Sequence, residues 1–173
     1  GILFAAIVSD TLYFRSPTAT LFDQDTAKRL AEQAGIEDAE AFAMEVLRHG
    51  SAIGTMPVQD IVRNDIKEFD FGKHRITVSQ INIMDRQQAL ERLGELQKAL
   101  NEFRKQEGYD LSLLMVTDIL GEATDLLAAG SPQTQLVHAF GEAAAEGCYH
   151  LPGVLSRKKQ IIPPLTEVFR KQD

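Results

Sequence analysis

The residue types best suited to chemistry lie in one basic stretch, Ser156–Gln160 (SRKKQ), of an otherwise acidic chain. A turn-prone LPG sequence precedes the stretch, and Ile161, Ile162, Pro163 and Pro164 close it. Proline lacks an amide hydrogen and disfavours helix at the residue before it, so we expect the three cations on a short, constrained element. If Ser156 caps a single helical turn, free amides and cationic side chains would point toward one phosphate-like dianion. The alternative is an ordinary solvated basic loop, which this stretch alone favours because short basic runs are common.

Two other charged residues stand at the ends of apolar or alternating segments. Asp10 follows the apolar run Ile2–Val8, a usual place for a functional carboxylate to emerge from a core. A capping role is the alternative for Asp10, and the local sequence favours it. Lys67 stands at the mouth of a predicted hairpin, where an ordinary surface lysine is the favoured interpretation. Neither residue defines a site without a partner elsewhere in the chain.

Composition limits the classes of function. The chain has 173 residues, 44% of them hydrophobic, which is enough for one substantial core plus a smaller piece. Its formal net charge of −7 argues against wrapping nucleic acid, whereas a local basic site on an acidic body suits a small anion. The single cysteine, Cys148, cannot form an internal disulfide, so we expect a reducing, cytoplasmic setting. No apolar run is long enough to span a membrane, so no membrane partner is expected.

Other common signatures do not occur. The sequence has no GxGxxG, Walker, CxxC or HExxH motif, and its four histidines show no metal-ligand spacing. We therefore expect the histidines to be structural or exposed, and Cys148 to be a small buried hydrophobic residue. The chain opens on Ile2–Val8 without an initiator methionine or a polar lead-in, so we expect a piece of a longer polypeptide.

The first third of the chain predicts helices. Periodicity does not decide between helix and strand for Ile2–Val8, because the run is short and apolar. A polar break at Arg15–Thr18 predicts a linker or exposed turn. A capping-box-like start at Thr20–Asp23 and a stop at Gly35 predict a helix at 20–34. A second helix is predicted at 38–49, ended by Gly50, and a third directly after Pro57.

The rest of the chain predicts an α/β fold. Alternating polarity predicts a hairpin from 67–71 and 75–83 with its turn at Gly72, and one end of the second strand faces a polar cleft. Asp85 is expected to cap a long helix at 86–106, which leads to a buried strand at 111–116. A strand, a long helix and another strand predict a parallel βαβ unit. Strands at 125–129 and 147–151 and helices at 132–140 and 165–171 complete the prediction.

Six segments, taken in chain order, resemble the manganese-dependent, DHH-type (family II) inorganic pyrophosphatases along essentially the whole chain. SRKKQ is the most specific part, and the others gain weight as a series. They are AAIVSDTL at 5–12, RSPT at 15–18, NDIKEF at 64–69, VTDIL at 116–120, LPGVLSRKKQ at 151–160 and PPL at 163–165.

The resemblance implies both architecture and site residues. Residues 1–19 would be the tail of an N-terminal DHH catalytic domain with its linker. Residues 20–173 would be the DHH-associated C-terminal domain, a mixed β-sheet flanked by helices that binds substrate. Asp10 would be a metal ligand, and Lys67, Arg157 and Lys158 would bind diphosphate. The cofactor would be Mn²⁺, with Mg²⁺ or Co²⁺ as alternatives, held mostly by the N-terminal domain; its DHH motif does not occur here, and catalytic residues stay unassigned.

The implied activity is hydrolysis of diphosphate to two orthophosphates with divalent metals. The full-length protein would be a cytoplasmic homodimer through its N-terminal domain, and this part alone would be monomeric and inactive. The segment from Arg15 to Thr20 would be a hinge for domain closure. Two alternatives remain: a related DHH phosphoesterase that acts on short-chain polyphosphate or a nucleotide, and a non-catalytic phosphate-binding module.

Overall fold

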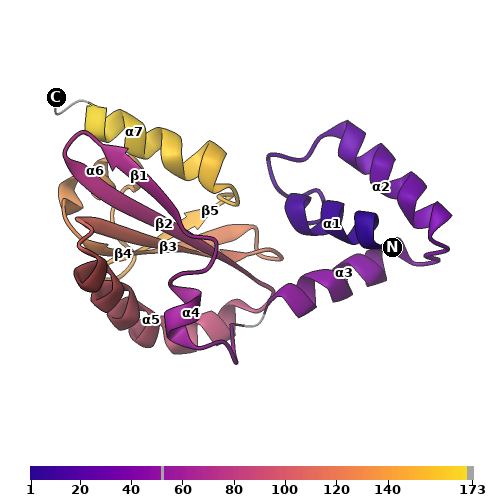
Figure 1. Ribbon diagram of the computed structural model, residues 1–173, viewed down its shortest axis with the longest axis horizontal. Coiled ribbons are helices and arrows are strands. Elements are labelled where there is room, and N and C mark those ends of the chain that lie inside the picture. Colours follow the sequence, from indigo (N-terminus) through magenta and orange to yellow (C-terminus); the bar gives the residue numbers. More distant parts are fainter. Residues whose placement is uncertain (52, 171–173) are drawn as a thin grey trace. The chain divides into compact units, whose positions relative to one another are not determined.

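The computed structural model describes residues 1–51 and 53–170, which form two compact units (Figure 1). The first unit is Gly1–Ala52 and the second is Ile53–Asp173. The predicted helix at 165–171 ends in the structure at Arg170, and its last residue, Lys171, lies outside the described part.

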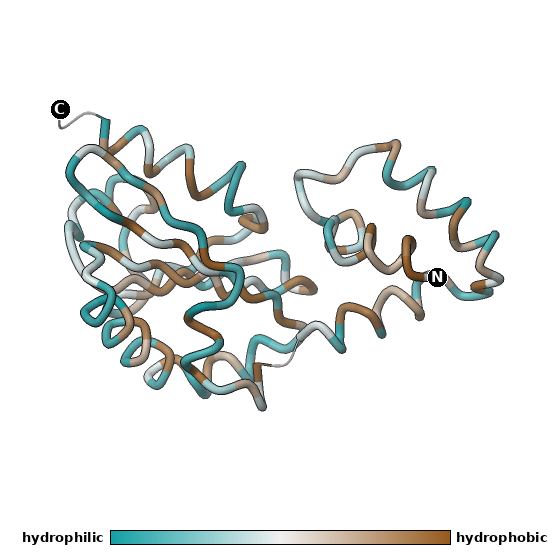
Figure 2. Tube along the Cα trace, in the orientation of Figure 1, coloured by the Kyte–Doolittle hydropathy of each residue, from teal (hydrophilic) through white to brown (hydrophobic). Residues whose placement is uncertain are grey.

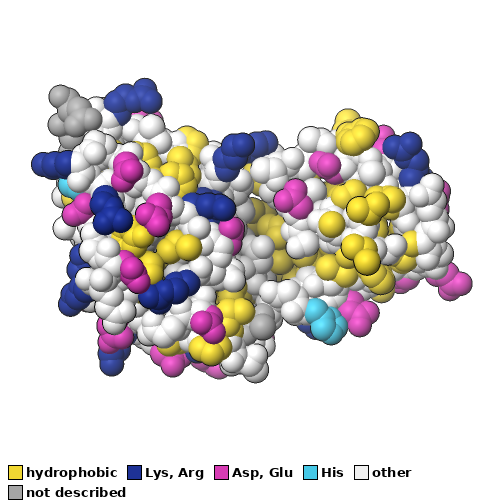
Figure 3. All heavy atoms as spheres, viewed as in Figure 1, with side chains coloured by type: hydrophobic (Ala, Val, Ile, Leu, Met, Phe, Trp, Pro, Cys, Tyr) yellow, Lys and Arg dark blue, Asp and Glu magenta, His cyan; other side chains and the backbone are white. Residues whose placement is uncertain are grey.

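The first unit consists of three helices, α1 (Ile2–Thr11), α2 (Leu21–Gln33) and α3 (Ala39–Gly50). Helix α1, whose type the sequence left open, packs on α2 and α3. The predicted capping box is confirmed, because the Thr20 side chain accepts from the Asp23 amide and the Asp23 carboxylate accepts from the Thr20 amide at 2.8 Å. This local pairing fixes where α2 begins. Figure 3 shows hydrophobic side chains gathered on the visible face of this unit.

The chain turns sharply after α1. Leu12, Tyr13 and Phe14 all have left-handed backbone angles, with φ of 51°, 49° and 66°. Such angles cost non-glycine residues about 1–2 kcal/mol each, so packing of the buried Leu12 side chain must hold the turn. The predicted hinge at Arg15–Thr20 begins just after this turn and lies inside the first unit, while the two units divide between 52 and 53. The domain boundary after residue 19 and the hinge stay predictions.

The second unit is a mixed α/β fold, as expected. Its sheet has the order β1-β2-β3-β4-β5, in which β2 and β3 are parallel and the other neighbours are antiparallel. The strands are β1 (Lys67–Phe71), β2 (His74–Ile83), β3 (Leu111–Asp118), β4 (Ala123–Gly130) and β5 (Cys148–Pro152). The helices are α4 (Val58–Ile61), α5 (Arg86–Glu107), α6 (Gln133–Phe140), the π-helical turn η1 (Arg157–Ile161) and α7 (Ile162–Arg170).

Local signals explain the connections that position the site. Gly72, with φ of 59°, makes the turn of the β1–β2 hairpin, where a side chain would be strained. Asp85 caps α5 by accepting from the Gln87 amide at 2.9 Å, and the left-handed Gly108 ends that helix. The resulting β2-α5-β3 crossover confirms the predicted parallel unit. It also brings the carboxyl ends of β2 and β3 to the same end of the sheet.

The sheet is covered on both faces, with α5 on one side and α6 and α7 on the other (Figure 1). Leu96 and Leu100 of α5 belong to one hydrophobic cluster, and Leu165 and Phe169 of α7 belong to the other. Figure 2 shows hydrophobic residues concentrated on the central strands. Burial of each such side chain contributes about 1.5–3 kcal/mol, so these two clusters hold the frame of the site rigid.

The basic stretch adopts one expected feature and departs from another. It forms a short element, η1, capped by the Ser156 hydroxyl, which accepts from the Lys159 amide at 3.3 Å. The two prolines do not close that element, however, because η1 runs directly into α7. Pro163 and Pro164 lie in the first turn of α7, where a missing amide hydrogen leaves no helical bond unmade. The expectation that Pro163 and Pro164 close this element was therefore wrong, whereas a short element capped by Ser156 was expected.

Candidate functional site

Arg157 is the first residue of η1, and its side chain reaches the loop before β1. Its Nη1 donates to the carbonyl of Val78 at 2.9 Å and also to the carbonyl of Asp65. Its Nη2 donates to the Asp65 carboxylate at 2.9 Å. The side chain is only 12% exposed. Three acceptors therefore fix the guanidinium plane beside the start of β1, at the end of the hairpin opposite its turn.

The loop that carries Asp65 is itself fixed to β2. Asn64 donates through its side chain to the carbonyl of Gln80 at 2.7 Å, and the Gln80 amide donates to the carbonyl of Asn64 at 3.1 Å. The Asp65 backbone has φ of 42°, a left-handed angle that aspartate adopts more readily than most residues. The backbone at Asp65 is thus held, while its side chain remains 54% exposed.

The structure brings Lys67 to the same carboxylate. Lys67 begins β1, and its Nζ lies 3.8 Å from Asp65 Oδ1. Its side chain is 60% exposed. Arg157 and Lys67, far apart in the sequence, are therefore adjacent across one acidic side chain. We call Asp65, Lys67 and Arg157 the anion cluster.

Lys158 does not join this cluster. Its side chain is exposed, and among residues 1–51 and 53–170 it forms no hydrogen bond or ion pair with Asp65. It follows Arg157 directly along η1, so it borders the cluster without sharing its acid. The structure thus brings together two of the three predicted substrate-binding residues.

Gln160 organises the loop before η1, a role that the sequence analysis did not identify. Its side-chain oxygen accepts from the amides of Leu155 and Ser156, each at 3.0 Å, and its side-chain nitrogen donates to the carbonyl of Gly153 at 2.7 Å. The Lys159 and Gln160 amides are also bonded, to the side chain and the carbonyl of Ser156. These bonds already engage the amides of Lys159 and Gln160, so the charged contacts of this site come from side chains.

Polar side chains line the carboxyl ends of β2 and β3 below this loop. Gln80 donates to Thr117 Oγ1 at 3.2 Å and to the carbonyl of Leu155 at 3.3 Å. Thr124 donates to the carbonyl of Val154 at 2.6 Å. The predicted polar end of the second hairpin strand is thus the support on which the loop before Arg157 rests.

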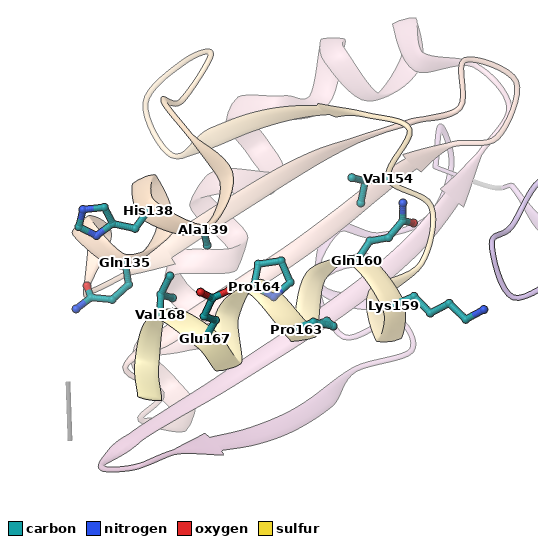
Figure 4. A pocket seen from close by; sticks show the side chains of 10 residues that line it. All are labelled: Gln135, His138, Ala139, Val154, Lys159, Gln160, Pro163, Pro164, Glu167 and Val168. Carbon is teal, nitrogen blue, oxygen red and sulfur yellow. The ribbon is translucent and has the colours of Figure 1, made fainter. Parts of the chain in front are cut away.

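A groove lies beside the cluster, between α6 and α7, with a volume of about 1040 Å³ (Figure 4). Lys159 and Gln160 of the basic stretch line one end, and Gln135, His138 and Glu167 line the rest together with apolar side chains. Arg157, Lys158 and Lys67 do not line it. Figure 3 shows basic and acidic side chains interspersed on the visible face of this unit. Arg157 and Lys67 therefore differ from the other cations by sharing the Asp65 carboxylate, and not by lying on a broad basic surface.

Asp10, the predicted metal ligand, lies in the last turn of α1 in the first unit and is exposed. An acid at a helix C-terminus is electrostatically unfavourable without a cation, because the last carbonyls also carry partial negative charge. Across residues 1–51 and 53–170, no group of three or more His, Cys, Asp or Glu side chains could hold a metal ion. Asp10 therefore fits one bond to a hard divalent ion, and not a complete site.

A second charged cluster escaped the sequence analysis. Asp125 of β4 is 5% exposed and accepts two hydrogen bonds from Arg86, at 2.7 and 2.9 Å. His150 of β5, its partner in the strand register, places Nδ1 2.7 Å from the same carboxylate. Burial alone would raise the pKa of Asp125, but the bonds from Arg86 and His150 outweigh it and hold that pKa below its ordinary value. We call Arg86, Asp125 and His150 the buried cluster.

Each member of the buried cluster comes from a different element. Arg86 begins α5, so its pairing with Asp125 ties the helix start to β4 and, through His150, to β5. The bond to Asp125 also raises the pKa of Arg86. Cys148 lies nearby on β5, and burial raises the pKa of its thiol. A satisfied, buried acid of this kind is suited to holding elements together.

No helix within the described ranges, 1–51 and 53–170, combines the length and apolarity needed to cross a membrane.

Comparison with known proteins agrees with the architecture. The DHHA2 domain family matches residues 44–168. A crystal structure from Methanococcus jannaschii, described as a family II inorganic pyrophosphatase, superposes with a TM-score of 0.88 at 37% identity. That match covers 98% of this chain and 54% of the other.

Curated relatives give the same picture. The manganese-dependent inorganic pyrophosphatase of Methanocaldococcus jannaschii is 38% identical over 169 residues, which are 98% of this chain and 55% of that protein. A Bacillus licheniformis protein named probable manganese-dependent inorganic pyrophosphatase is 36% identical over 170 residues. The chain thus spans about half the length of the curated relatives it matches. Since the family match covers well over half of its residues, the chain belongs to the DHHA2 domain family.

Proposed function

We propose that this chain is the substrate-binding lobe of an inorganic pyrophosphatase that hydrolyses diphosphate to two orthophosphates. The observation that supports this most directly is the anion cluster, in which Arg157 and Lys67 face one carboxylate across 2.9 and 3.8 Å. Two oxygens of that carboxylate bridge a guanidinium and an ammonium. Two oxygens of a phosphoryl group can bridge the same pair, because the guanidinium fork fits oxyanions and the ammonium adds a point charge.

Each predicted residue takes a defined part in this proposal. Arg157 orients one phosphoryl group, and its bonds to Val78 and Asp65 carbonyls hold the guanidinium in place. Lys67 neutralises charge on the same group, and the exposed Lys158 reaches the second phosphoryl group from the next position of η1. Neutralising charge that develops on the transferred and leaving groups is the main catalytic contribution in phosphoryl transfer.

The relatives are named for manganese, and the carboxylate of Asp10 would contribute one hard oxygen ligand. A divalent ion bound there would lower the pKa of its water and supply hydroxide at neutral pH. We infer that the remaining ligands, and the homodimer contact, belong to the part of the relatives that this chain does not span. We also propose a cytoplasmic location, from the single cysteine and the resemblance.

The direct test is diphosphate binding by calorimetry to the protein and to Arg157→Ala. We expect the wild-type chain to bind weakly and the variant to lose binding. Arg170→Ala, which removes an exposed arginine from the far end of α7, serves as the matched control and should bind normally. Equal binding by all three proteins would contradict the proposed site.

Activity distinguishes this proposal from its alternatives. Turnover of diphosphate, triphosphate and a nucleotide by the full-length polypeptide should show a clear preference for diphosphate. A preference for triphosphate or the nucleotide would indicate a related phosphoesterase. Binding of diphosphate without turnover, in a polypeptide that lacks a DHH motif, would indicate a phosphate-binding module.

A further inference from the structure

Asp65 occupies the position in which the proposed function places a phosphoryl group. Its Oδ2 accepts from Arg157 Nη2 at 2.9 Å, and its Oδ1 lies 3.8 Å from Lys67 Nζ. We infer that the Asp65 carboxylate competes with the substrate anion for Arg157 and Lys67: it holds the two cations when no anion is bound and is displaced when substrate binds. This inference rests on the proposed function and assigns a new role within the same site.

The two edges of the Arg157 guanidinium differ in a way that permits displacement. Nη1 is held by the backbone carbonyls of Val78 and Asp65, which cannot move without unfolding the loop or the strand. Nη2 is held by the Asp65 carboxylate, an exposed group on a rotatable side chain. The backbone contacts can therefore keep the guanidinium oriented while the carboxylate leaves and a phosphoryl oxygen takes its place.

The Asp65 backbone also favours a swing of the side chain alone. The reciprocal bonds between Asn64 and Gln80 hold the chain immediately before it. Rotation about χ1 then moves the carboxylate toward solvent without disturbing β1. Ion pairs between exposed groups contribute little to stability, since water solvates the separated charges well. A polyanion can therefore displace this carboxylate at small cost.

A returning carboxylate would also help product leave. Orthophosphate carries less charge than diphosphate, so Asp65 competes with it more effectively for Arg157 and Lys67. The same side chain thus weakens retention of product and, before substrate binds, opposes the binding of other anions to Arg157. In this role the carboxylate contacts the two cations before substrate binds and again as product leaves.

The test is calorimetric binding of diphosphate, and separately of orthophosphate, to wild type, Asp65→Asn and Asp70→Asn. Asparagine keeps the shape of aspartate and tolerates the left-handed backbone, so Asp65→Asn should fold. We expect it to bind both anions about 5-fold more tightly, the change expected when an exposed ion pair no longer competes. Asp70→Asn removes an equal charge three residues beyond Lys67 on β1 and should change affinity less than 2-fold, as roughly expected for a screened surface charge.

A second measurement needs no variant. In the wild-type protein, the side-chain carboxyl ¹³C resonance of Asp65 should shift during a diphosphate titration, in parallel with the guanidinium signals of Arg157. If the Arg157 signals move while the Asp65 signal does not, Asp65 is a permanent positioning residue and the inference is wrong.

The outcomes separate the inference from the proposed function. Wild-type binding that needs Arg157 but is unchanged or weakened in Asp65→Asn overturns the competitor role and leaves the proposed function standing. Absence of binding by wild type and by Asp65→Asn overturns both. Binding that first becomes measurable in Asp65→Asn supports both.

Discussion

Two clusters in the second unit each join one aspartate to an arginine and a second basic residue, but in opposite settings. The anion cluster joins Asp65 to Arg157 and Lys67, and the buried cluster joins Asp125 to Arg86 and His150. The acid is 54% exposed in the first and 5% exposed in the second. The arginine contacts have similar lengths, so geometry alone does not separate them. Access of water to the carboxylate distinguishes them, because a buried carboxylate cannot leave its partners without losing its hydrogen bonds, whereas water can solvate an exposed one.

The comparison predicts its largest effect for loss of Arg86. Arg86→Ala leaves the buried Asp125 carboxylate with one polar neighbour, and an uncompensated buried charge costs roughly 3–5 kcal/mol of unfolding free energy. Asp65→Asn in the anion cluster, which keeps a side chain that tolerates the left-handed backbone, should cost less than about 1 kcal/mol. Urea unfolding of both variants measures the difference. Equal losses would show that burial does not distinguish the two clusters.

The next largest effect is expected at acid pH, where the buried cluster should lose its contribution to stability. The folded pKa of Asp125 lies below its ordinary value, so the stabilisation is complete above the unfolded pKa of about 3.9 and is lost as pH falls through the folded pKa. Wild type should therefore lose stability in this acid range more steeply than Asp125→Asn. Urea midpoints measured between neutral and acid pH give both slopes. Parallel curves for wild type and Asp125→Asn would contradict the linkage.

Substitution of Gln160 tests how far the anion cluster depends on the loop at 153–156. Gln160→Leu removes three hydrogen bonds to the loop at 153–156 and should cost roughly 1–3 kcal/mol, with weaker diphosphate binding because Arg157 loses its fixed starting point. Gln160→Glu retains the two accepted bonds and should lose less of both properties. Thermal unfolding and calorimetry on the same samples compare them. Normal affinity in Gln160→Leu would show that the loop does not position Arg157.

Lys67 should show the smallest effect on stability. Its exposed pair with Asp65 is 3.8 Å long, so Lys67→Gln should change the unfolding free energy by less than about 0.5 kcal/mol. The same variant should bind diphosphate more weakly, and the affinity difference from wild type should shrink as salt screens the charge. Calorimetry at two salt concentrations measures this. A large loss of stability would show that Lys67, like Arg86, holds the fold together.

Sequence reasoning succeeded where the cause of a structure lies within a few residues. The capping box of Thr20 and Asp23, the Asp85 cap and the Gly72 turn each depend on neighbours in the chain, so their patterns were sufficient. The type of α1 was left open because its apolar run has no period. The closing role given to Pro163 and Pro164 failed because proline interrupts a helix interior but fits its first turn.

The clusters depend on longer separations. Arg86, Asp125 and His150 meet through a strand register and a helix start, neither of which any local pattern records. The resemblance named Lys67 and Arg157 but gave Asp65 no role, although it lies two residues before Lys67 in the NDIKEF segment. An acid within a segment proposed to bind anions was the available signal. The roles of Asp10, Lys67, Arg157 and Lys158 stay predictions.

The position of β1 at the end of the sheet order has a consequence beyond substrate. An outer strand presents backbone donors and acceptors that a second molecule can pair with, and charged side chains discourage such edge-to-edge aggregation. β1 is five residues long, and three of its residues, Lys67, Glu68 and Asp70, are charged. Lys67, which we propose holds an anion, therefore also discourages pairing at this edge strand. Replacing it with an apolar residue would favour self-association as well as weaken ligand binding.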